Sequence, residues 1–395
     1  MEGVYKACQE GLNLSISMKI GIVCYPTFGG SGVVATELGK ALADRGHQIH
    51  FVTYNQPARL DFFSENLFYH EVSVAQYPLF DYPPYELALA SRLVDVVRFE
   101  KLDILHVHYA IPHASAAFMA KQILTTYGIS IPVITTLHGT DITLVGQDNT
   151  LKPVVTFSIN KSDGVTAVSE HLKADTYKYF KIEKDIRVIP NFIDMNRFSL
   201  KPKDHFKKAI APNGEKIMVH TSNFRKVKRT EDVIEMFARV IKTIPSKLLM
   251  VGDGGERSLC EKLSRTLGIS EHVRFLGKQD AIEEILSVAD LFLMPSVSES
   301  FGLAALEAMA CKVPVISSNA GGLPELNIEG VTGFLLDVGD VEGMAQKAIY
   351  ILEDEERLQQ FKENALERAK QLQLSNIMPL YESYYEEVIE NSKHQ

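Results

Sequence analysis

The sequence predicts an α/β protein with two doubly wound domains, because short apolar segments alternate with amphipathic ones along the chain. The short segments are rich in β-branched residues, as the strands of buried parallel sheets are. The chain has 395 residues, more than one hydrophobic core normally organises. Since no low-complexity linker divides it further, we expect two such domains, facing each other across a cleft.

Six strands are expected in the first half of the chain, with helical periodicity between them. The first helix is expected over Val33–Asp44, where four apolar side chains can share one face. The six strand segments are Lys19–Cys24, Gln48–Thr53, Ile104–His108, Val133–Thr136, Gly164–Val168 and Arg187–Ile189.

The second half repeats this rhythm and then becomes helical after Asp340. The strand signal stops between Pro190 and Gly214, where a charged segment with a proline intervenes. We therefore expect domains at 18–200 and 201–375, an extension at 1–17, and a C-terminal helix at 376–395 that packs back towards the first domain. The strands of the second half are Ile217–His220, Leu248–Val251, Val273–Leu276, Leu291–Met294, Val315–Ser317 and Phe334–Leu336.

Composition narrows the function classes. Apolar residues make up 46% of the chain and charged residues 23%, a balance typical of globular proteins. A formal net charge of -9 argues against a general nucleic-acid binder. No apolar run approaches the roughly 18 residues of a membrane span, and residues 1–17 lack the pattern of a signal peptide. We expect a cytoplasmic protein, and its four scattered cysteines indicate neither disulfides nor a zinc site.

The first motif is the loop Gly29-Gly30-Ser31-Gly32, which lies between the first strand and its helix. Backbone N–H groups at a helix N-terminus attract anions. The loop is not a dinucleotide fingerprint, because the spacing is not GxGxxG and the second strand ends in Thr53-Tyr54-Asn55 without an acid for the ribose. A NAD-linked oxidoreductase is thus disfavoured, and a tight turn that simply needs glycine is the structural alternative.

The second motif is the basic loop Ser222–Arg229, which follows the first strand of the second half and carries four cations. At the carboxyl end of a strand, such cations can hold a diphosphate and stabilise the charge of a leaving phosphate. The alternative is a solvated basic loop.

The third motif is Glu299–Glu307, in which two glutamates flank a helix start. Ser300 and Gly302 leave N–H groups for a phosphate, and Glu307 lies two turns into the helix. Both carboxylates can accept hydrogen bonds from sugar hydroxyls. The alternative is a pair of exposed acids that only favour the positive end of the helix dipole.

Together with Val251-Gly252-Asp253-Gly254, these motifs resemble, in the same order, those of the retaining GT-B glycosyltransferases of the sucrose-synthase-like class, family 4. The resemblance extends from Lys19 to about Leu380. It implies the GT-B fold, in which one Rossmann-like domain binds the acceptor and the second binds a nucleotide sugar.

A narrower resemblance is to the members of this class that transfer GlcNAc from UDP-GlcNAc to the hydroxyl of L-malate, the first step of bacillithiol biosynthesis. It implies an α-linked product. It also implies UDP-GlcNAc and L-malate as partners, with no cofactor and no stable membrane association. No Asp-x-Asp motif occupies a comparable strand end, so we expect no metal. The sequence leaves a homo-oligomer open. The segments that carry the likeness are Cys24–Pro26, Gly29–Gly32, Tyr82–Tyr85, His106–His113, Thr135–Thr143 and Ser222–Arg229.

The resemblance also implies roles for individual residues. Lys228 and Arg225 are expected on the donor diphosphate, Glu299 on the sugar hydroxyls and His138 beside the transferred sugar. The wider class has arginine where this chain has Asn223. The expected donor-binding residues are Gly29, Gly30, Asn223, Gly252, Leu276, Lys278, Ser300, Phe301, Gly302, Leu303 and Glu307, with Glu307 on the ribose and Leu276 to Lys278 along the uracil.

For the acceptor we expect Ser31, Tyr109 and Thr140, since neutral donors near a helix start can hold carboxylates, and also Arg59. Three segments depart from the family: Cys311–Pro314, Pro57–Arg59 and Ala75–Pro78, the last two by lacking the expected aromatic and polar residues. Lys312 stands where a helix-capping glycine is usual, which would cost on the order of 1 kcal/mol in a left-handed conformation. Ala58 replaces an aromatic or polar residue.

Two further readings stay open at this point. A transferase of the same class could use a lipid or glycan acceptor in envelope synthesis, although no basic, aromatic face is evident in the first domain. The other is a protein that binds a sugar nucleotide without catalysing transfer. The presence of Glu299 and Lys228 argues against it.

Overall fold

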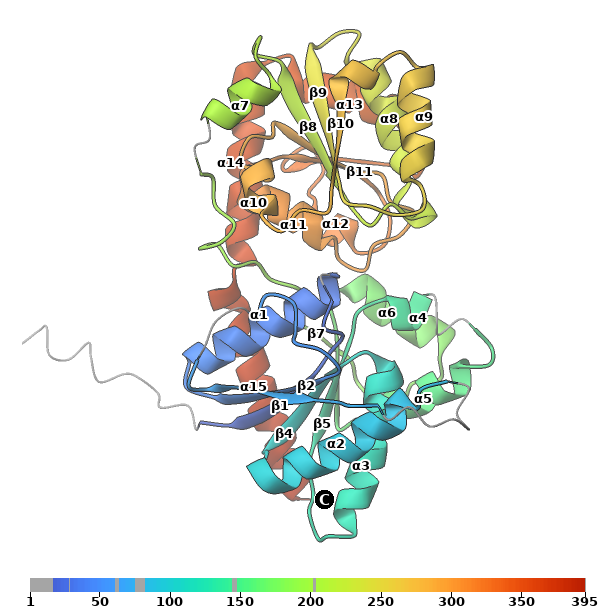
Figure 1. Ribbon diagram of the computed structural model, residues 1–395, viewed down its shortest axis with the longest axis vertical. Coiled ribbons are helices and arrows are strands. Elements are labelled where there is room, and N and C mark those ends of the chain that lie inside the picture. The colour runs from blue at the N-terminus through green and yellow to red at the C-terminus, as the bar shows by residue number, and fades with distance from the viewer. Residues whose placement is uncertain are drawn as a thin grey trace, which may run out of the picture. The chain divides into compact units, whose positions relative to one another are not determined.

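The computed structural model describes residues 17–27, 29–60, 64–74, 82–143, 148–201 and 204–394. Residues 1–16 of the expected extension and Pro202 and Lys203 of the predicted linker lie outside the described residues. The described chain forms two parallel sheets flanked by helices (Figure 1). It separates into two compact units: unit 1 comprises Met1–His108, Pro112–Ile134 and Val388–Gln395, and unit 2 comprises Tyr109–Ile111 and Thr135–Glu387, each so far as it is described.

The first sheet has seven strands in the order β3-β2-β1-β4-β5-β6-β7. Its pairing is parallel, with Ile20 of β1 opposite both Ile49 of β2 and Ile104 of β4. The order changes direction at β1 and β4, as in doubly wound folds. The strands are β1 (Lys19–Val23), β2 (Gln48–Thr53), β3 (Leu67–Glu71), β4 (Ile104–His108), β5 (Val133–Leu137), β6 (Gly164–Ala167) and β7 (Arg187–Val188).

In unit 1, α2 and α3 share an apolar core with β1, β2 and β4, and α1 lies on the other face of these strands (Figure 1). Helix α2 contributes mainly leucine and valine side chains to this core and α3 mainly alanines, which let the helices pack closely. The helices between the strands of the first sheet are α1 (Gly30–Asp44), α2 (Tyr85–Glu100), η1 (Ala110–Ala114), α3 (Ser115–Thr125), α4 (Thr140–Thr143), α5 (Lys152–Lys161) and α6 (Glu170–Tyr179).

The second sheet, in unit 2, has six strands in the order β10-β9-β8-β11-β12-β13. Its apolar core joins β8, β9, β11 and β12 to α8, α9 and α13 (Val341–Leu352), and Leu358 and Phe361 of α14 (Glu355–Gln371) belong to the same core. The strands are β8 (Lys216–Thr221), β9 (Ser246–Val251), β10 (Val273–Gly277), β11 (Leu291–Met294), β12 (Val315–Ser318) and β13 (Gly333–Leu336). The helices are α7 (Asp204–Ile210), η3 (Lys226–Lys228), α8 (Thr230–Val240), α9 (Arg257–Thr266), η4 (Ser270–His272), α10 (Ile282–Leu286), α11 (Leu303–Ala310) and α12 (Leu323–Leu326).

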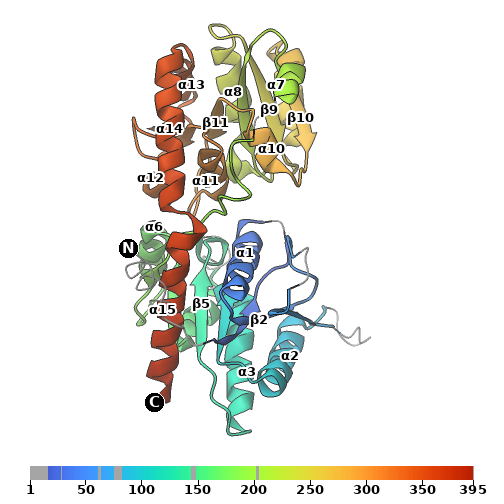
Figure 2. The same cartoon turned by 90° about the vertical axis from the view of Figure 1, so that its left-hand side faces the viewer.

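The chain ends in three consecutive helices, α13 (Val341–Leu352), α14 (Glu355–Gln371) and α15 (Leu374–Lys393), as the sequence predicts (Figure 2). Tyr381 and Tyr385 of α15 are fully buried. The hydroxyl of Tyr384 accepts a hydrogen bond from the Val165 N–H at 2.9 Å and lies 3.3 Å from the Val165 carbonyl oxygen. Helix α15 is therefore bonded to β6 within unit 2.

The predicted fold class is confirmed, and all twelve predicted strands are present within a residue or two of the expected bounds. One strand, β3, was not predicted. It is an edge strand whose residues are only partly buried or exposed, and its apolar run, residues 67–69, is short. None of the helices in the described part of the chain combines the length and apolar content that a membrane-spanning helix needs.

Candidate functional site

The central features of the site lie at the point where the strand order of the second sheet reverses. The basic loop follows β8 and the Glu299 loop follows β11, and these two strands are neighbours in the sheet. Parallel strands present their carboxyl ends at one edge, and ligands of doubly wound folds bind where the order reverses. The fold thus brings two motifs together that are 71 residues apart in the sequence.

Lys228 and Glu299 form an ion pair at this edge. Lys228 Nζ lies 2.6 Å from Glu299 Oε1, and the Ser296 hydroxyl donates to the same oxygen at 2.7 Å. The side chains of the lysine and the glutamate are only 18% and 12% exposed. The Val297 N–H donates to the Val227 carbonyl at 2.8 Å, so the two loops are also joined through their backbones. The pair is therefore held in a partly desolvated position, where electrostatic interactions are stronger than in water.

His220, near the end of β8, holds the start of the basic loop through hydrogen bonds. Its Nδ1 lies 2.8 Å from the Leu293 carbonyl, which can only accept, so Nδ1 carries the proton. Its Nε2 therefore accepts from the Ser222 hydroxyl at 2.8 Å, and Ser222 Oγ accepts from the Phe224 N–H at 3.3 Å. Burial lowers the pKa of His220 to about 4, and the charge of Lys228 adds to this effect. A neutral histidine thus links β11 to the start of the basic loop.

The four cations of the basic loop differ in their surroundings. Arg225 and Lys226 are exposed, whereas Lys228 is half-buried. Arg229 has a left-handed backbone (φ 47°), and its guanidinium binds both carboxylate oxygens of Asp232 at 2.6 and 3.0 Å. Arg229 therefore anchors the start of α8. Arg225 and Lys228 are the cations that were predicted to contact the donor.

Gly252 fixes the loops after β8, β9 and β10 against one another. A Cβ at Gly252 would lie 1.8 Å from the Ser222 carbonyl oxygen, and the backbone φ of +116° also favours glycine. The Gly252 N–H donates to the Gly277 carbonyl at 2.8 Å. Asn223 and Lys278 are exposed at this edge and Leu276 is half-buried, so these three predicted donor residues belong to adjoining loops.

The turn from Ser300 to Leu303 leads directly into α11. Phe301 is buried, and Gly302 has φ +99° just before the helix begins at Leu303. The Gly322 N–H donates to the Glu299 carbonyl at 2.7 Å, which ties this turn to the loop before α12. Glu307 is half-buried on α11. The predicted cluster of Glu299, the turn and Glu307 is therefore one continuous structural element.

The loop after β5 carries His138 and is anchored by Asp141. The carboxylate of Asp141 accepts hydrogen bonds from the N–H groups of His138 (3.3 Å), Gly139 (3.0 Å) and Ala110 (3.1 Å). Burial raises the pKa of Asp141 to about 6, while these hydrogen bonds act in the opposite direction. His138 is 9% exposed, and its ring lies 5.3 Å from that of Tyr109. Asp141 thus joins the loops after β4 and β5.

Ser300 connects the two groups of loops within unit 2. The Ser169 hydroxyl donates to the Ser300 carbonyl at 2.6 Å. A Cβ at Gly139 would lie 1.7 Å from Ser300 Oγ, so only glycine allows this approach. Unit 2 therefore holds the His138 loop next to the turn that follows Glu299, with Thr140 exposed at the start of α4.

The remaining predicted residues belong to unit 1. Helix α1 begins at Gly30 with Gly29 as its extended N-cap residue, so the expected helix start is present, three residues earlier than the predicted Val33. Gly29 and Gly30 are exposed and Ser31 is half-buried. Arg59 has a left-handed backbone (φ 67°), and its carbonyl accepts a hydrogen bond from Lys40 Nζ at 3.4 Å.

Three residues that position these loops were not assigned a role from the sequence: Asp141, Ser169 and His220. Asp141 and Ser169 are at or near helix starts, where acids and hydroxyls accept backbone hydrogen bonds, so their local positions carried a usable signal. His220 is a polar residue in a buried strand, and its partner on β11 is distant in sequence. Only the sheet order reveals that contact.

Comparison with known proteins adds family evidence. The family model for Glycosyltransferase Family 4 matches residues 28–197, and the model for glycosyl transferases group 1 matches residues 201–368.

Curated relatives are similar over nearly the whole chain. The chain is 48% identical to N-acetyl-alpha-D-glucosaminyl L-malate synthase of Bacillus anthracis, over 96% of this chain and 99% of that protein. It is 25% identical to the D-inositol 3-phosphate glycosyltransferase of Thermobispora bispora, over 92% and 90% of the two chains.

Among solved structures, the Anabaena protein HepE in complex with UDP and glucose has a TM-score of 0.78 at 22% identity, covering 93% of this chain and 99% of that one. Sucrose-phosphate synthase from Thermosynechococcus elongatus also has a TM-score of 0.78, at 21% identity, covering 95% and 100%. These two likenesses concern the fold.

Proposed function

This chain belongs to the glycosyltransferase family that includes N-acetyl-α-D-glucosaminyl L-malate synthase, and from that premise we propose that it transfers GlcNAc from UDP-GlcNAc to the hydroxyl of L-malate with retention of the α-configuration. This reaction is the first step of bacillithiol biosynthesis. The observation that carries the proposal is the 48% identity to the Bacillus anthracis enzyme over 96% of the chain. A UDP-sugar and malate are cytoplasmic metabolites, so the proposed reaction calls for a cytoplasmic enzyme.

The proposed donor site is the edge of the second sheet at β8 and β11. Lys228 and Arg225 neutralise the diphosphate as its bond to the sugar breaks, and the start of α11 adds N–H groups. Glu299 accepts hydrogen bonds from the sugar hydroxyls, and Glu307 from the ribose. Lys228 Nζ and Glu299 Oε1 are 2.6 Å apart, which supports this assignment. A sugar diphosphate needs a cation for its phosphates close to a hydrogen-bond acceptor for its sugar hydroxyls.

The proposed transfer takes place on one face of the sugar. The hydroxyl oxygen of malate bonds to the anomeric carbon as the bond to UDP breaks, and the departing phosphate accepts the hydroxyl proton. A covalent intermediate would need a free carboxylate near His138. Asp141 is buried and accepts three backbone hydrogen bonds, which makes it a poor nucleophile. This supports the front-face path.

The proposed acceptor site uses Ser31, Tyr109, Thr140 and Arg59, whose donors suit the two carboxylates of malate. We further propose that residues 18–200 form the acceptor domain and 201–375 the donor domain, followed by a helix at 376–395. The ranges of the two family models, 28–197 and 201–368, support this division.

We propose transfer without a metal ion. Among the residues that the structure describes, the one group of three His, Cys, Asp or Glu side chains close enough to hold a metal is His50, His70 and Glu100. None of these three belongs to the proposed donor site. Lys228 and Arg225 supply the positive charge that a metal would otherwise provide.

The experiment that tests the function measures UDP release from UDP-GlcNAc with a panel of acceptors: L-malate, D-malate, glycerol, inositol 3-phosphate and a lipid alcohol. We expect release with L-malate to exceed release with the others at least tenfold. Proton NMR of the product should show the small coupling of an α-anomer. A β-anomeric coupling would reject retention, and UDP release with another acceptor of the panel but not with L-malate would reject malate as the acceptor.

A further inference from the structure

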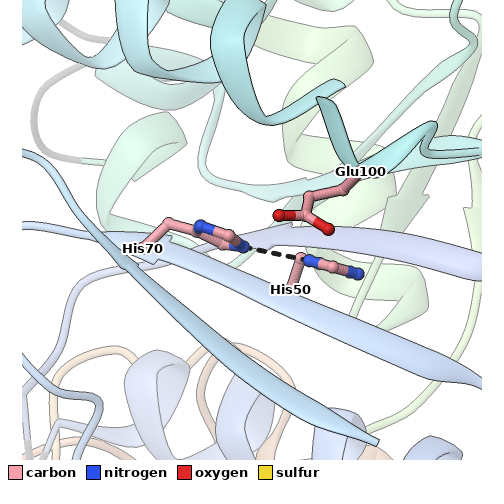
Figure 3. Close-up of side chains that lie close together, drawn as sticks. All are labelled: His50, His70 and Glu100. Carbon is pink, nitrogen blue, oxygen red and sulfur yellow. Dashed lines mark hydrogen bonds between the residues drawn. The ribbon is translucent and has the colours of Figure 1, made fainter. Parts of the chain in front are cut away.

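A compact group of metal-ligating side chains lies in unit 1, outside the loops described above. His50 is in β2, His70 is in β3 and Glu100 is the last residue of α2 (Figure 3). In the parallel pairing of these strands, His50 is opposite Phe68 and Val52 is opposite His70. The two histidines are therefore offset by two residues and project from the same face of the sheet.

The three side chains converge closely. His50 Nδ1 and His70 Nε2 are 2.9 Å apart, and the two rings are stacked with an interplanar angle of 13°. One ligand atom from each of the three residues lies within 4.8 Å of the other two. Figure 3 shows the Glu100 carboxylate directed towards the histidine pair. His50 is buried, and His70 and Glu100 are half-buried, so the group borders on solvent.

We propose that His50, His70 and Glu100 bind a zinc ion. Two imidazole nitrogens and one carboxylate oxygen form a ligand set that zinc favours, with water as the fourth ligand. Bonds of about 2.0–2.2 Å in a tetrahedral site place ligand atoms about 3.3 Å apart. The ring nitrogens are already 2.9 Å apart, so the histidines need only small movements and Glu100 a change of side-chain torsion.

The protonation states suit this ligand set. The 2.9 Å contact between His50 Nδ1 and His70 Nε2 is a hydrogen bond, so one of these two nitrogens carries no proton. Binding through the facing nitrogens replaces their hydrogen bond, and each ring then carries its proton on the other nitrogen. His50 Nε2 is buried and has no hydrogen-bond partner among the described residues, but it is not one of the two facing nitrogens and is not a ligand in this proposal.

The neighbouring charges limit the affinity. Lys19 Nζ donates to the Glu100 carbonyl at 3.1 Å, and the charges of Lys19 and Arg92 contribute to the lowered pKa of His50 and His70, respectively. These two cations oppose a dication, and Glu100 supplies the one negative ligand. We therefore expect weaker binding than at closed structural zinc sites.

Isothermal titration of the metal-free full chain with Zn²⁺ at pH 7.5 tests the proposal. We expect one equivalent to bind, and the affinity to fall at least tenfold in His70→Gln and in Glu100→Gln. Both positions are half-buried, so these variants should fold. Glu86→Gln is the matched control, because it removes the same charge at the other end of α2. Its affinity should equal that of the wild type.

Zinc-edge X-ray absorption of the one-to-one complex adds a structural readout. We expect a four-coordinate shell of nitrogen and oxygen at about 2.0–2.1 Å that includes imidazole scattering. Circular dichroism of each variant without metal verifies folding. Equal zinc affinity in the wild type, His70→Gln and Glu100→Gln would overturn the proposal, as would the absence of binding to the folded wild type. The zinc site is independent of the proposed transferase reaction, so UDP release does not enter this test.

Discussion

Replacing Lys228 by alanine removes the cation that forms an ion pair with Glu299. In the structure their charged atoms are 2.6 Å apart in a site where the two side chains are 18% and 12% exposed. The variant leaves the Glu299 carboxylate with its hydrogen bond from Ser296 but without a counter-charge. Two consequences follow, one for stability and one for transfer.

The loss of stability should be moderate. Removing one partner from a fully buried pair costs about 3–5 kcal/mol, because a charge is left unpaired. Glu299 keeps a hydrogen bond and some contact with water, so we expect about 1–3 kcal/mol. Folded domains are stable by about 5–15 kcal/mol, so Lys228→Ala should remain folded at room temperature.

The loss of transfer should be larger. If Lys228 stabilises the charge that develops on the leaving diphosphate, its removal raises the barrier by about 2.7–4 kcal/mol, or roughly 10²–10³ in kcat. Glu299→Ala should cause a loss of at least about 10², because it removes the sugar contact. Lys226 is an exposed cation two residues away in the same loop. Lys226→Ala is therefore the matched control and should retain near-normal kcat.

Steady-state UDP release and urea unfolding of the three variants separate these effects. The reasoning predicts a large fall in kcat for Lys228→Ala and Glu299→Ala at temperatures where both are fully folded. Near-normal kcat in those two variants would refute the site assignment. An equal loss in Lys226→Ala would show that the net charge of the loop, and not the position of Lys228, matters.

Three further predictions concern the cap after α11, the buried His220 and metal dependence. Lys312 has a left-handed backbone with φ +61°. Lys312→Gly should therefore raise the free energy of unfolding by about 1 kcal/mol, even though it removes the ion pair with Glu363. Lys312→Ala keeps the strained backbone, so urea unfolding of this variant should show no gain in stability. The pKa of His220 is lowered to about 4 from 6.5, so its stabilising effect is complete above pH 6.5 and is lost as the pH falls towards 4. Urea unfolding should show the stability gap between wild type and His220→Gln narrowing by about 2 kcal/mol from pH 7.5 to pH 5, and a constant gap would contradict this. UDP release should be unchanged by EDTA, and activity lost to EDTA and regained with Mg²⁺ or Mn²⁺ would contradict metal-independent transfer.

Most of the fold could be predicted because buried parallel strands are short apolar runs, and the runs at β8 and β11 are clear examples. Strand β3 was not predicted because its apolar part, residues 67–69, is short and is followed by His70 and Glu71, as suits an edge strand that buries little. The start of α1 at Gly30 also differs from the predicted Val33, since the apolar periodicity begins only after the glycine-rich turn.

The sequence suggests candidate site residues, but it does not show which of them contact one another. The sequence indicates that Lys228 and Glu299 follow strands, yet their pairing depends on β8 and β11 being neighbours, which local patterns do not reveal. The two hydrogen bonds from Arg229 to Asp232 join residues that are three positions apart, so the sequence spacing alone could have indicated them. The role of Asp141 requires the folded path of two separate loops.

The bond between Tyr384 and Val165 has a consequence for synthesis of the chain. The two residues are 219 positions apart, and at about 5–20 residues per second the ribosome adds Tyr384 roughly 10–40 s after Val165. During that interval the backbone of Val165 lacks its final partner, and the pocket for Tyr381 and Tyr385 is unfilled. Nascent chains of unit 2 therefore complete this core only after α15 has left the ribosome.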